Sequence, residues 1–395
     1  MWKIVLPGIA MIGVTYAFAR YSFGLFLPEI SSALNLSESQ SGLIGSVAYA
    51  AYTLALVTAA IFIHKMSARH VVLYSGATAF IGMLGMAASQ GFYTLAISAF
   101  IAGLGSGWVS PAFSQVVAQS LESRERDRGN TWINTGTSVG VVASGPVALA
   151  FAEQWRWGYV LFAILAFLTL WWNARAIDRP EEEPEQSTGS QFKLSMLGQV
   201  RFMIIAAIGI GFSSSIYWTF SRSYLTEVHD FSVPESTIFW TIMGAAGIIG
   251  GIAGTIIQRI GLGWSYRLGV LVATASLITL MIPHAAAIYL SAILFGISFI
   301  FMTGLFIVWG TRHFPDTPSV GVSLSFFSLG VGQSLGSIGA GALIDGMSYP
   351  IAFLSFAAIG LLFIFIKTNA QPVSTQTSSP RPCAAHNSHT IRSDE

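Results

Sequence analysis

Two arginines, Arg20 and Arg222, lie deep inside long apolar segments of the chain. An ionisable side chain is costly at membrane depth and usually marks a pathway for an ion or a substrate. Each arginine has a tyrosine four or five residues before it, Tyr16 and Tyr217, which is close to one helical turn away. A guanidinium group presents a planar fork of donors that matches a carboxylate or a phosphate. The pattern therefore predicts two cationic groups that bind an anion.

The acidic residues are distributed differently. All 18 Asp and Glu residues lie in loops, tails or at the ends of apolar segments, and no His lies near the centre of one. Glu29 and Glu227 are the carboxylates nearest to the arginines, so either could couple transport to protons. Two alternatives remain: Glu29 is a plain interfacial carboxylate, and each arginine snorkels to the outer interface.

Tyr49 and Gln333 are two further candidates for binding a substrate, because a buried phenol or amide requires a hydrogen-bond partner. Bonds between helices would satisfy them equally well. The single cysteine, Cys383, excludes a cysteine-based metal site. His386 and His389 lie in a polar tail, where a solvated segment is favoured over a metal site. We expect neither a metal nor a cofactor.

The elements that hold these residues must be membrane helices. Of 395 residues, 53% are hydrophobic and 9% are charged, and the mean hydropathy is +0.65. Soluble domains carry roughly 25% charged residues. This composition excludes a soluble enzyme and a nucleic-acid-binding protein, and it predicts an all-α, polytopic membrane protein whose surroundings are a lipid bilayer.

Twelve apolar runs approach the length of about 20 residues that a helix needs to cross a bilayer. They cover residues 4–28, 40–63, 71–88, 93–119, 132–152, 158–172, 202–226, 237–257, 268–282, 285–310, 321–344 and 351–366. The first run is too long for a signal peptide and contains Arg20, so it is expected to be a retained helix.

The basic residues alternate with these runs. When loops are assigned alternately to two sides, 16 of the 19 Lys and Arg residues lie on one side, and only Arg156 lies on the other. Short cytoplasmic loops hold an excess of Lys and Arg. Both termini are therefore predicted to be cytoplasmic, and a bacterial inner membrane is the simplest location for a chain without a visible targeting segment.

The polar stretches divide the chain into four parts. We predict a six-helix bundle at 1–172, a cytoplasmic linker at 173–199, a second six-helix bundle at 200–367 and a disordered cytoplasmic tail at 368–395. Pro and Glu dominate the middle of the linker, and Ser, Thr, Pro and Asn dominate the tail.

The two halves share a loop motif. Gly254, at the end of the eighth run, and Arg259 and Gly261, just after it, form the motif in the second half, and Lys65 and Arg69 occupy the same loop of the first half. The former loop resembles the G-x-x-x-[D/K]-R-x-G-R-[R/K] signature of the major facilitator superfamily, and the latter resembles a degenerate form of it. The resemblance implies twelve helices in two pseudo-symmetric bundles, in which these loops take part in conformational change.

The first run carries a second resemblance. Tyr16, Arg20 and Pro28 follow the pattern Tyr-x-x-x-Arg with Pro eight residues later. It is similar to that of the organophosphate:phosphate antiporters and related organic-anion carriers of the superfamily. In those proteins an arginine on the first and on the seventh helix grips the anion, which implies that role for Arg20, Arg222 and Tyr16.

These patterns predict a secondary active transporter of a small organic anion, a carboxylate, which works by alternating access as a proton symporter or an anion exchanger. A monomer is expected. The alternative is an efflux pump for drugs or other lipophilic solutes, although the lack of central carboxylates disfavours cationic drugs. No P-loop motif is present, so ATP is not the direct energy source. An enzyme is not expected, because the helix centres offer no His or acid for catalysis.

Overall fold

The chain is helical throughout the part that the structure describes. The structure is a computed structural model that describes residues 1–178, 197–315 and 317–368, and no strand occurs in these ranges. Eight helices there are long and apolar enough to cross a membrane. A ninth span results if Val233–Gly250 and Ala253–Leu280, which are bent by 71°, count as one. Each of the twelve predicted runs lies on one helix or on consecutive helices, which confirms the predicted all-α membrane fold.

The first half contains the six runs predicted for it. Its helices are α1 (Trp2–Ile12), the π-helix η1 (Gly13–Tyr21), α2 (Ser22–Leu34), α3 (Glu38–Met66), α4 (Ala68–Ala88), α5 (Phe92–Ser120), α6 (Ser123–Asn134), α7 (Gly136–Phe151), the short 3₁₀ helix η2 (Ala152–Gln154) and α8 (Trp155–Ala176). Because α1, η1 and α2 follow one another without a break, they form the first span together.

The second half begins with α9. Its helices are α9 (Leu197–Val228), α10 (Val233–Gly250), α11 (Ala253–Leu280), α12 (Ala285–His313), α13 (Pro318–Gly346), α14 (Tyr349–Leu362) and the 3₁₀ turn η4 (Phe363–Phe365). The predicted break between the eighth and ninth runs lies inside α11, at Gly261, whose φ of 80° and ψ of 162° are not helical. Glycine adopts this backbone conformation without the steric cost that a Cβ atom brings.

The helices on both sides of the predicted linker extend into it, so the linker is shorter than predicted. Helix α8 continues to Ala176, beyond the predicted boundary at residue 172, and α9 begins at Leu197, before the predicted start at residue 200. Residues 179–196 of the linker and residues 369–395 of the predicted tail lie outside the described part of the chain.

Two helices begin with the same local device. The Ser37 hydroxyl accepts from the backbone N–H of Gln40, and the Gln40 side chain accepts from the backbone N–H of Ser37, so α3 starts with a capping box. Ser232 and Glu235 form the equivalent box at the start of α10. Such boxes satisfy backbone donors that have no partner inside the helix, so these sequences fix where both helices begin.

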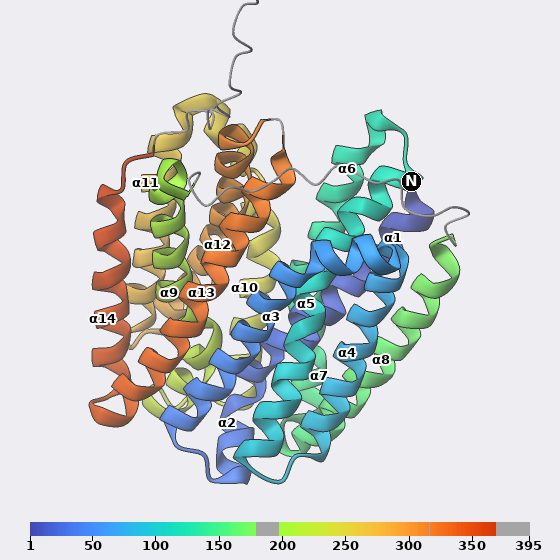
Figure 1. Cartoon of the computed structure of the whole chain (residues 1–395). Helices are drawn as coiled ribbons and strands as arrows, with labels where there is room; N and C mark the ends of the chain where they lie inside the picture. The colour runs from blue at the N-terminus through green and yellow to red at the C-terminus, as the bar shows by residue number, and fades with distance from the viewer. Residues whose placement is uncertain (179–196, 316, 369–395) are drawn as a thin grey trace, which may run out of the picture.

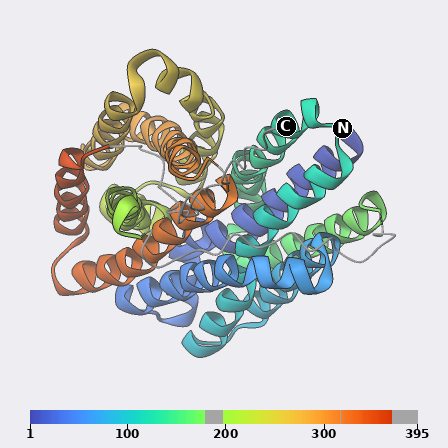
Figure 2. The same cartoon turned by 45° about the horizontal axis from the view of Figure 1, so that its top comes forward.

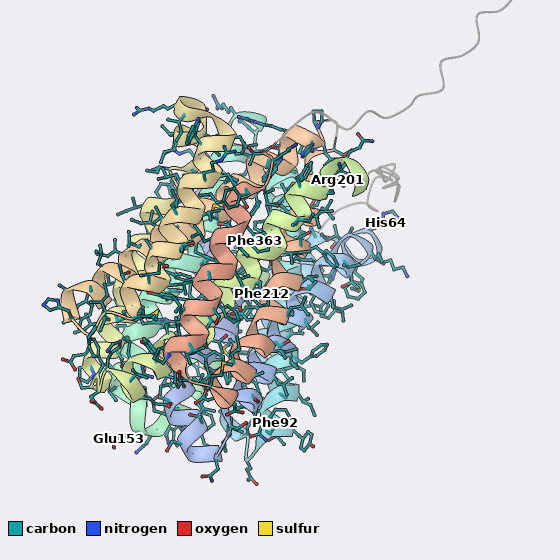
Figure 3. The ribbon with its side chains drawn as sticks, turned by 90° about the vertical axis from the view of Figure 1, so that its left-hand side faces the viewer. His64, Phe92, Glu153, Arg201, Phe212 and Phe363 are labelled. Carbon is teal, nitrogen blue, oxygen red and sulfur yellow. The ribbon has the colours of Figure 1, made fainter. Side chains whose placement is uncertain are left out.

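The two ends of the molecule differ. Phe92 and Glu153 lie at one end, and His64 and Arg201 lie toward the other, where Met1 also lies (Figures 1 and 3). The ribbons of the two halves diverge toward the Met1 end (Figure 1). Helices α3 and α13 belong to different halves and run side by side (Figure 2). We call the opposite end, where the ribbons of the two halves stay together, the closed end (Figure 1). It carries the loops 35–37, 229–232, 281–284 and 347–348.

Tight backbone contacts join the halves toward this closed end. A Cβ atom on Gly24 of α2 would lie only 1.9 Å from the carbonyl oxygen of Trp218 in α9. Real Cβ atoms do not approach that closely, and the obstacle is backbone rather than a flexible side chain. The close approach of α2 and α9 therefore requires glycine at this position.

We predict that Gly24→Ala separates the halves at the closed end, because the added methyl group overpacks the contact at a cost of about 1 to 3 kcal/mol. The check is a distance measurement between spin labels on Ser32→Cys and Met347→Cys, two exposed positions on opposite halves at that end, in protein whose native cysteine is removed by Cys383→Ala. The distance should lengthen. Gly91→Ala is the control, since a Cβ atom there meets nothing within 4 Å. An unchanged distance in the Gly24 variant would contradict the steric argument.

Candidate functional site

Arg20 lies on η1 inside a cage of four tyrosines. Its side chain is 5% exposed. The central guanidinium carbon lies 4.6 Å from the ring centroid of Tyr16, 4.5 Å from that of Tyr21, 5.7 Å from that of Tyr49 and 4.2 Å from that of Tyr52. Aromatic faces attract a cation electrostatically, which lowers the cost of burying this charge. Tyr16 and Tyr49, both predicted from the sequence as binding residues, thus surround Arg20.

The four tyrosines do not neutralise the positive charge of Arg20. Its Nη2 donates to the Tyr21 hydroxyl at 2.5 Å, and its Nη1 donates to the Ser106 hydroxyl at 3.4 Å. The Nε atom is buried and has no hydrogen-bond partner among the described residues. Arg20 also forms no ion pair with any described acidic residue. The site therefore holds a buried positive charge and an unused donor, two features that are chemically suited to an anion.

The local backbone positions this charge. Residues Gly13–Tyr21 form a π-helix, whose wider turns are rare and often occur at functional sites. Phe18 stacks on Phe162 of α8, with ring centroids 4.4 Å apart. On the other side, the Tyr16 and Ser110 hydroxyls are 3.1 Å apart. Packing against α8 and hydrogen bonding to α5 thus hold the π-helix from two sides, with Arg20 inside the bundle.

The cage touches the second half through Tyr21. Its ring stacks on Trp218 of α9, with centroids 4.0 Å apart and an interplanar angle of 16°. Trp218 in turn makes edge contacts with Trp240, Phe295 and Phe299. The Arg20–Tyr21 hydrogen bond is therefore one step from an aromatic cluster of the other half.

Arg222 is placed differently from Arg20. Its Nη1 and Nη2 donate to the two carboxylate oxygens of Glu29, both at 2.7 Å, and its Nε donates to the Ser236 hydroxyl at 3.1 Å. Nη1 also donates to the backbone carbonyl of Leu25. The expectation that both arginines offer free guanidinium groups to one anion is not met in this structure. Instead, Arg222 forms a bidentate ion pair that joins α2 to α9 across the halves.

The remaining predicted residues lie apart from the tyrosine cage or at its edge. The Tyr217 hydroxyl is 2.8 Å from the Ser291 hydroxyl and its ring stacks on Phe295, so Tyr217 packs within the second half. Glu227 accepts from the Tyr349 hydroxyl at 3.3 Å and is exposed. Gln333 is fully buried, and neither atom of its amide has a partner among the described residues.

The loop residues occupy the Met1 end. Arg69 donates to the backbone carbonyls of Ala174 and Ile177, at 2.7 and 2.9 Å, and so ties its loop to the end of α8. Lys65 and Arg259 are exposed. A Cβ atom on Gly254 or on Gly261 would meet nothing within 4 Å.

Several residues of the site escaped the sequence analysis. Tyr21 and Trp218 lie within segments already singled out for Arg20 and Arg222, but aromatic residues are common in membrane helices and carry no signal of their own. Ser106 lies in the glycine-rich part of α5, where small residues usually serve helix packing. Only the fold shows that these residues meet.

Comparison with known proteins gives three findings. The family model described as "Major Facilitator Superfamily" matches residues 9–320. The hexuronate transporter of Bacillus subtilis is 24% identical and the match covers 95% of this chain and 97% of the relative, while the cis,cis-muconate transport protein of Acinetobacter baylyi is also 24% identical, with coverages of 89% and 92%. The solved structure of a D-xylose–proton symporter superposes with a TM-score of 0.75 at 14% identity, covering 94% of this chain and 98% of that one.

Proposed function

Because the chain belongs to the Major Facilitator Superfamily, we propose that it is a secondary transporter that moves a small organic anion across a membrane by alternating access. The observation that carries this proposal is Arg20, a buried cation with an unused donor and no acidic partner among the described residues. A charge in this position is costly unless a ligand compensates for it. The anion binds at Arg20, among the four tyrosines.

A carboxylate is the favoured anionic group. The guanidinium fork binds a carboxylate through two parallel hydrogen bonds. Two relatives that match most of this chain are named for hexuronate and for cis,cis-muconate, both of which carry carboxylates. Tyr16 and Tyr49 line the anion site, and Gln333 contributes a neutral amide from the second half.

The ion pair between Glu29 and Arg222 serves as a latch at the closed end. It joins the two halves, so it must break when the halves rock apart at that end. Proton symport and anion exchange are both compatible with the anion site. Glu29 is the proton-coupling group that we favour, because its protonation removes the charge that Arg222 requires, and Glu227 is the second candidate.

The positions of the basic residues support a topology in which the Met1 end faces the cytoplasm. The latch then lies on the outer side of a bacterial inner membrane. We propose a monomer, because each chain supplies both halves that alternate around the site.

The proposal is tested by a thermal-shift screen of the purified protein against carboxylates, phosphate esters, amino acids and cationic drugs. A ligand that binds only the folded state stabilises it, by about 2.7 kcal/mol when present at a hundredfold excess over Kd. We expect carboxylates to raise the melting temperature and to compete for uptake into proteoliposomes. Stabilisation by cationic drugs alone would favour the efflux pump instead.

A further inference from the structure

We propose that the transported anion carries a single negative charge and that the rest of the molecule is uncharged, so that dianions of the same size are poor substrates. This inference rests on the proposed function, since it assigns a substrate class to the site at Arg20. It follows from the number of positive charges available to a ligand and from the neutral groups around them.

The described part of the chain contains two buried Lys or Arg side chains, Arg20 and Arg222. Glu29 compensates for the charge of Arg222 through both of its oxygens, and the Leu25 carbonyl and the Ser236 hydroxyl accept two further hydrogen bonds from Arg222. Arg222 is therefore not available to a substrate while the closed end is latched. Arg20 alone offers one uncompensated positive charge.

The groups near Arg20 are neutral. Its guanidinium is surrounded by tyrosines and by Ser106, and the tyrosine cage continues into the second half through Trp218. The indole Nε1 of Trp218 is buried without a hydrogen-bond partner among the described residues. These groups can accept or donate hydrogen bonds, or contact apolar surface, but they do not compensate for a second carboxylate.

Gln333 adds a neutral donor and acceptor from α13. A Cβ atom on Gly330 would meet the ring of Tyr52, so this side of α13 faces the cage. Cβ atoms on Gly332 and Gly336 would meet the backbone of α9. With about 3.6 residues per turn, Gln333 lies between these two faces, on the side of α13 that points toward the middle of the molecule. Its amide atoms are both unpartnered, so they are available to an uncharged polar group of a substrate.

A dianion would therefore bury one carboxylate without a counter-charge. Such a charge loses its hydration and gains nothing in return, whereas a hydroxyl or an apolar group at the same place loses little. Charge, rather than size, should decide between substrates of the same carbon skeleton.

The test compares two matched pairs of probes in wild-type protein: sorbate with trans,trans-muconate, and galactonate with galactarate. The members of each pair share an open six-carbon chain of the same configuration and differ by one carboxylate. In the pair whose monoanion binds more tightly, we expect that monoanion to compete for uptake and to stabilise the protein. The concentration needed should be at least about tenfold lower than that of its dianion partner. If dianions bind as well as monoanions, the single-charge inference is wrong although the proposed function stands. If no carboxylate of a wider panel binds, the proposed function itself fails.

Gln333→Lys supplies a second positive charge and is expected to improve dianion competition relative to monoanion competition by at least about tenfold. Gln333→Leu is the matched control, because it removes the amide without adding charge and should not favour dianions. A folded Gln333→Lys protein that still discriminates against dianions would argue against the place assigned to Gln333. The wild-type comparison tests the charge rule even if the lysine variant does not fold.

Discussion

Arg20→Lys is expected to reduce uptake of the anion by at least about a hundredfold, while the protein remains folded in the membrane. Lysine keeps the charge but lacks the planar fork, so it cannot bind a carboxylate in two places and also contact Tyr21 and Ser106. A hydrogen bond to a charged group contributes about 1.5 to 3 kcal/mol, and the lysine loses about two of those that the guanidinium fork makes to the carboxylate and to the cage. Since each 1.4 kcal/mol is about a factor of ten, the expected loss is a hundredfold or more.

The measurement is uptake of a labelled carboxylate by proteoliposomes, with the amount of folded protein checked by size-exclusion chromatography. Arg175→Lys is the matched control. Arg175 lies at the end of α8, is exposed and rests over the ring of Trp171, so the same substitution there removes a surface contact only. Wild-type uptake by the Arg20 variant would rule out Arg20 as the anion-binding group.

Glu29→Gln is expected to abolish accumulation driven by a pH gradient while exchange of anions across the membrane continues. The amide has the shape of the protonated acid but cannot release a proton, and it leaves Arg222 buried without its counter-charge. Loss of one member of a buried pair costs about 3 to 5 kcal/mol, and this cost falls on the state in which the closed end is latched. The variant should therefore spend less time in that state.

Two measurements separate these effects. Proteoliposomes with an acidic exterior report accumulation, and counterflow of labelled anion reports exchange. Glu153→Gln is the matched control, since Glu153 is exposed at the same end of the molecule and has no role in the proposal (Figure 3). Glu227→Gln tests the second candidate in the same two assays. Undiminished pH-driven accumulation in the Glu29 variant would exclude Glu29 as the coupling group. If the wild-type protein shows exchange but no such accumulation, proton symport is excluded.

Much of the fold could be predicted from the sequence because the bilayer imposes a simple rule. Apolar runs of sufficient length become helices, and the twelve predicted runs all fall on helices of the structure. The ends of the helices were less predictable. Helix α8 continues to Ala176 through polar residues such as Asn173, whose side chain donates to the Pro7 carbonyl. That contact joins two helices, so it could not be predicted from a local sequence pattern.

The candidate site was predictable only in part. A charge inside an apolar run is visible in the sequence, so Arg20 and Arg222 could be identified. Their different partners could not, because Glu29 lies 193 residues from Arg222 in the chain and meets it only through the packing of α2 against α9. The π-helix around Arg20 likewise leaves no residue signature. It decides which tyrosines surround the guanidinium group, and the contact between Tyr21 and Arg20 therefore emerges only from the fold.

The proposed anion site at Arg20 and the ion pair of Glu29 lie on one continuous helical span. Arg20 and Glu29 both belong to the unbroken span Trp2–Leu34, nine residues apart, which corresponds to about 13 Å along a helix. Nine residues also amount to about two and a half turns, so the two side chains point in nearly opposite directions. A change in the winding of η1 would turn α2 about its own axis. Binding of an anion at Arg20 and breakage of the ion pair between Glu29 and Arg222 would then be coupled through rotation of this one helix.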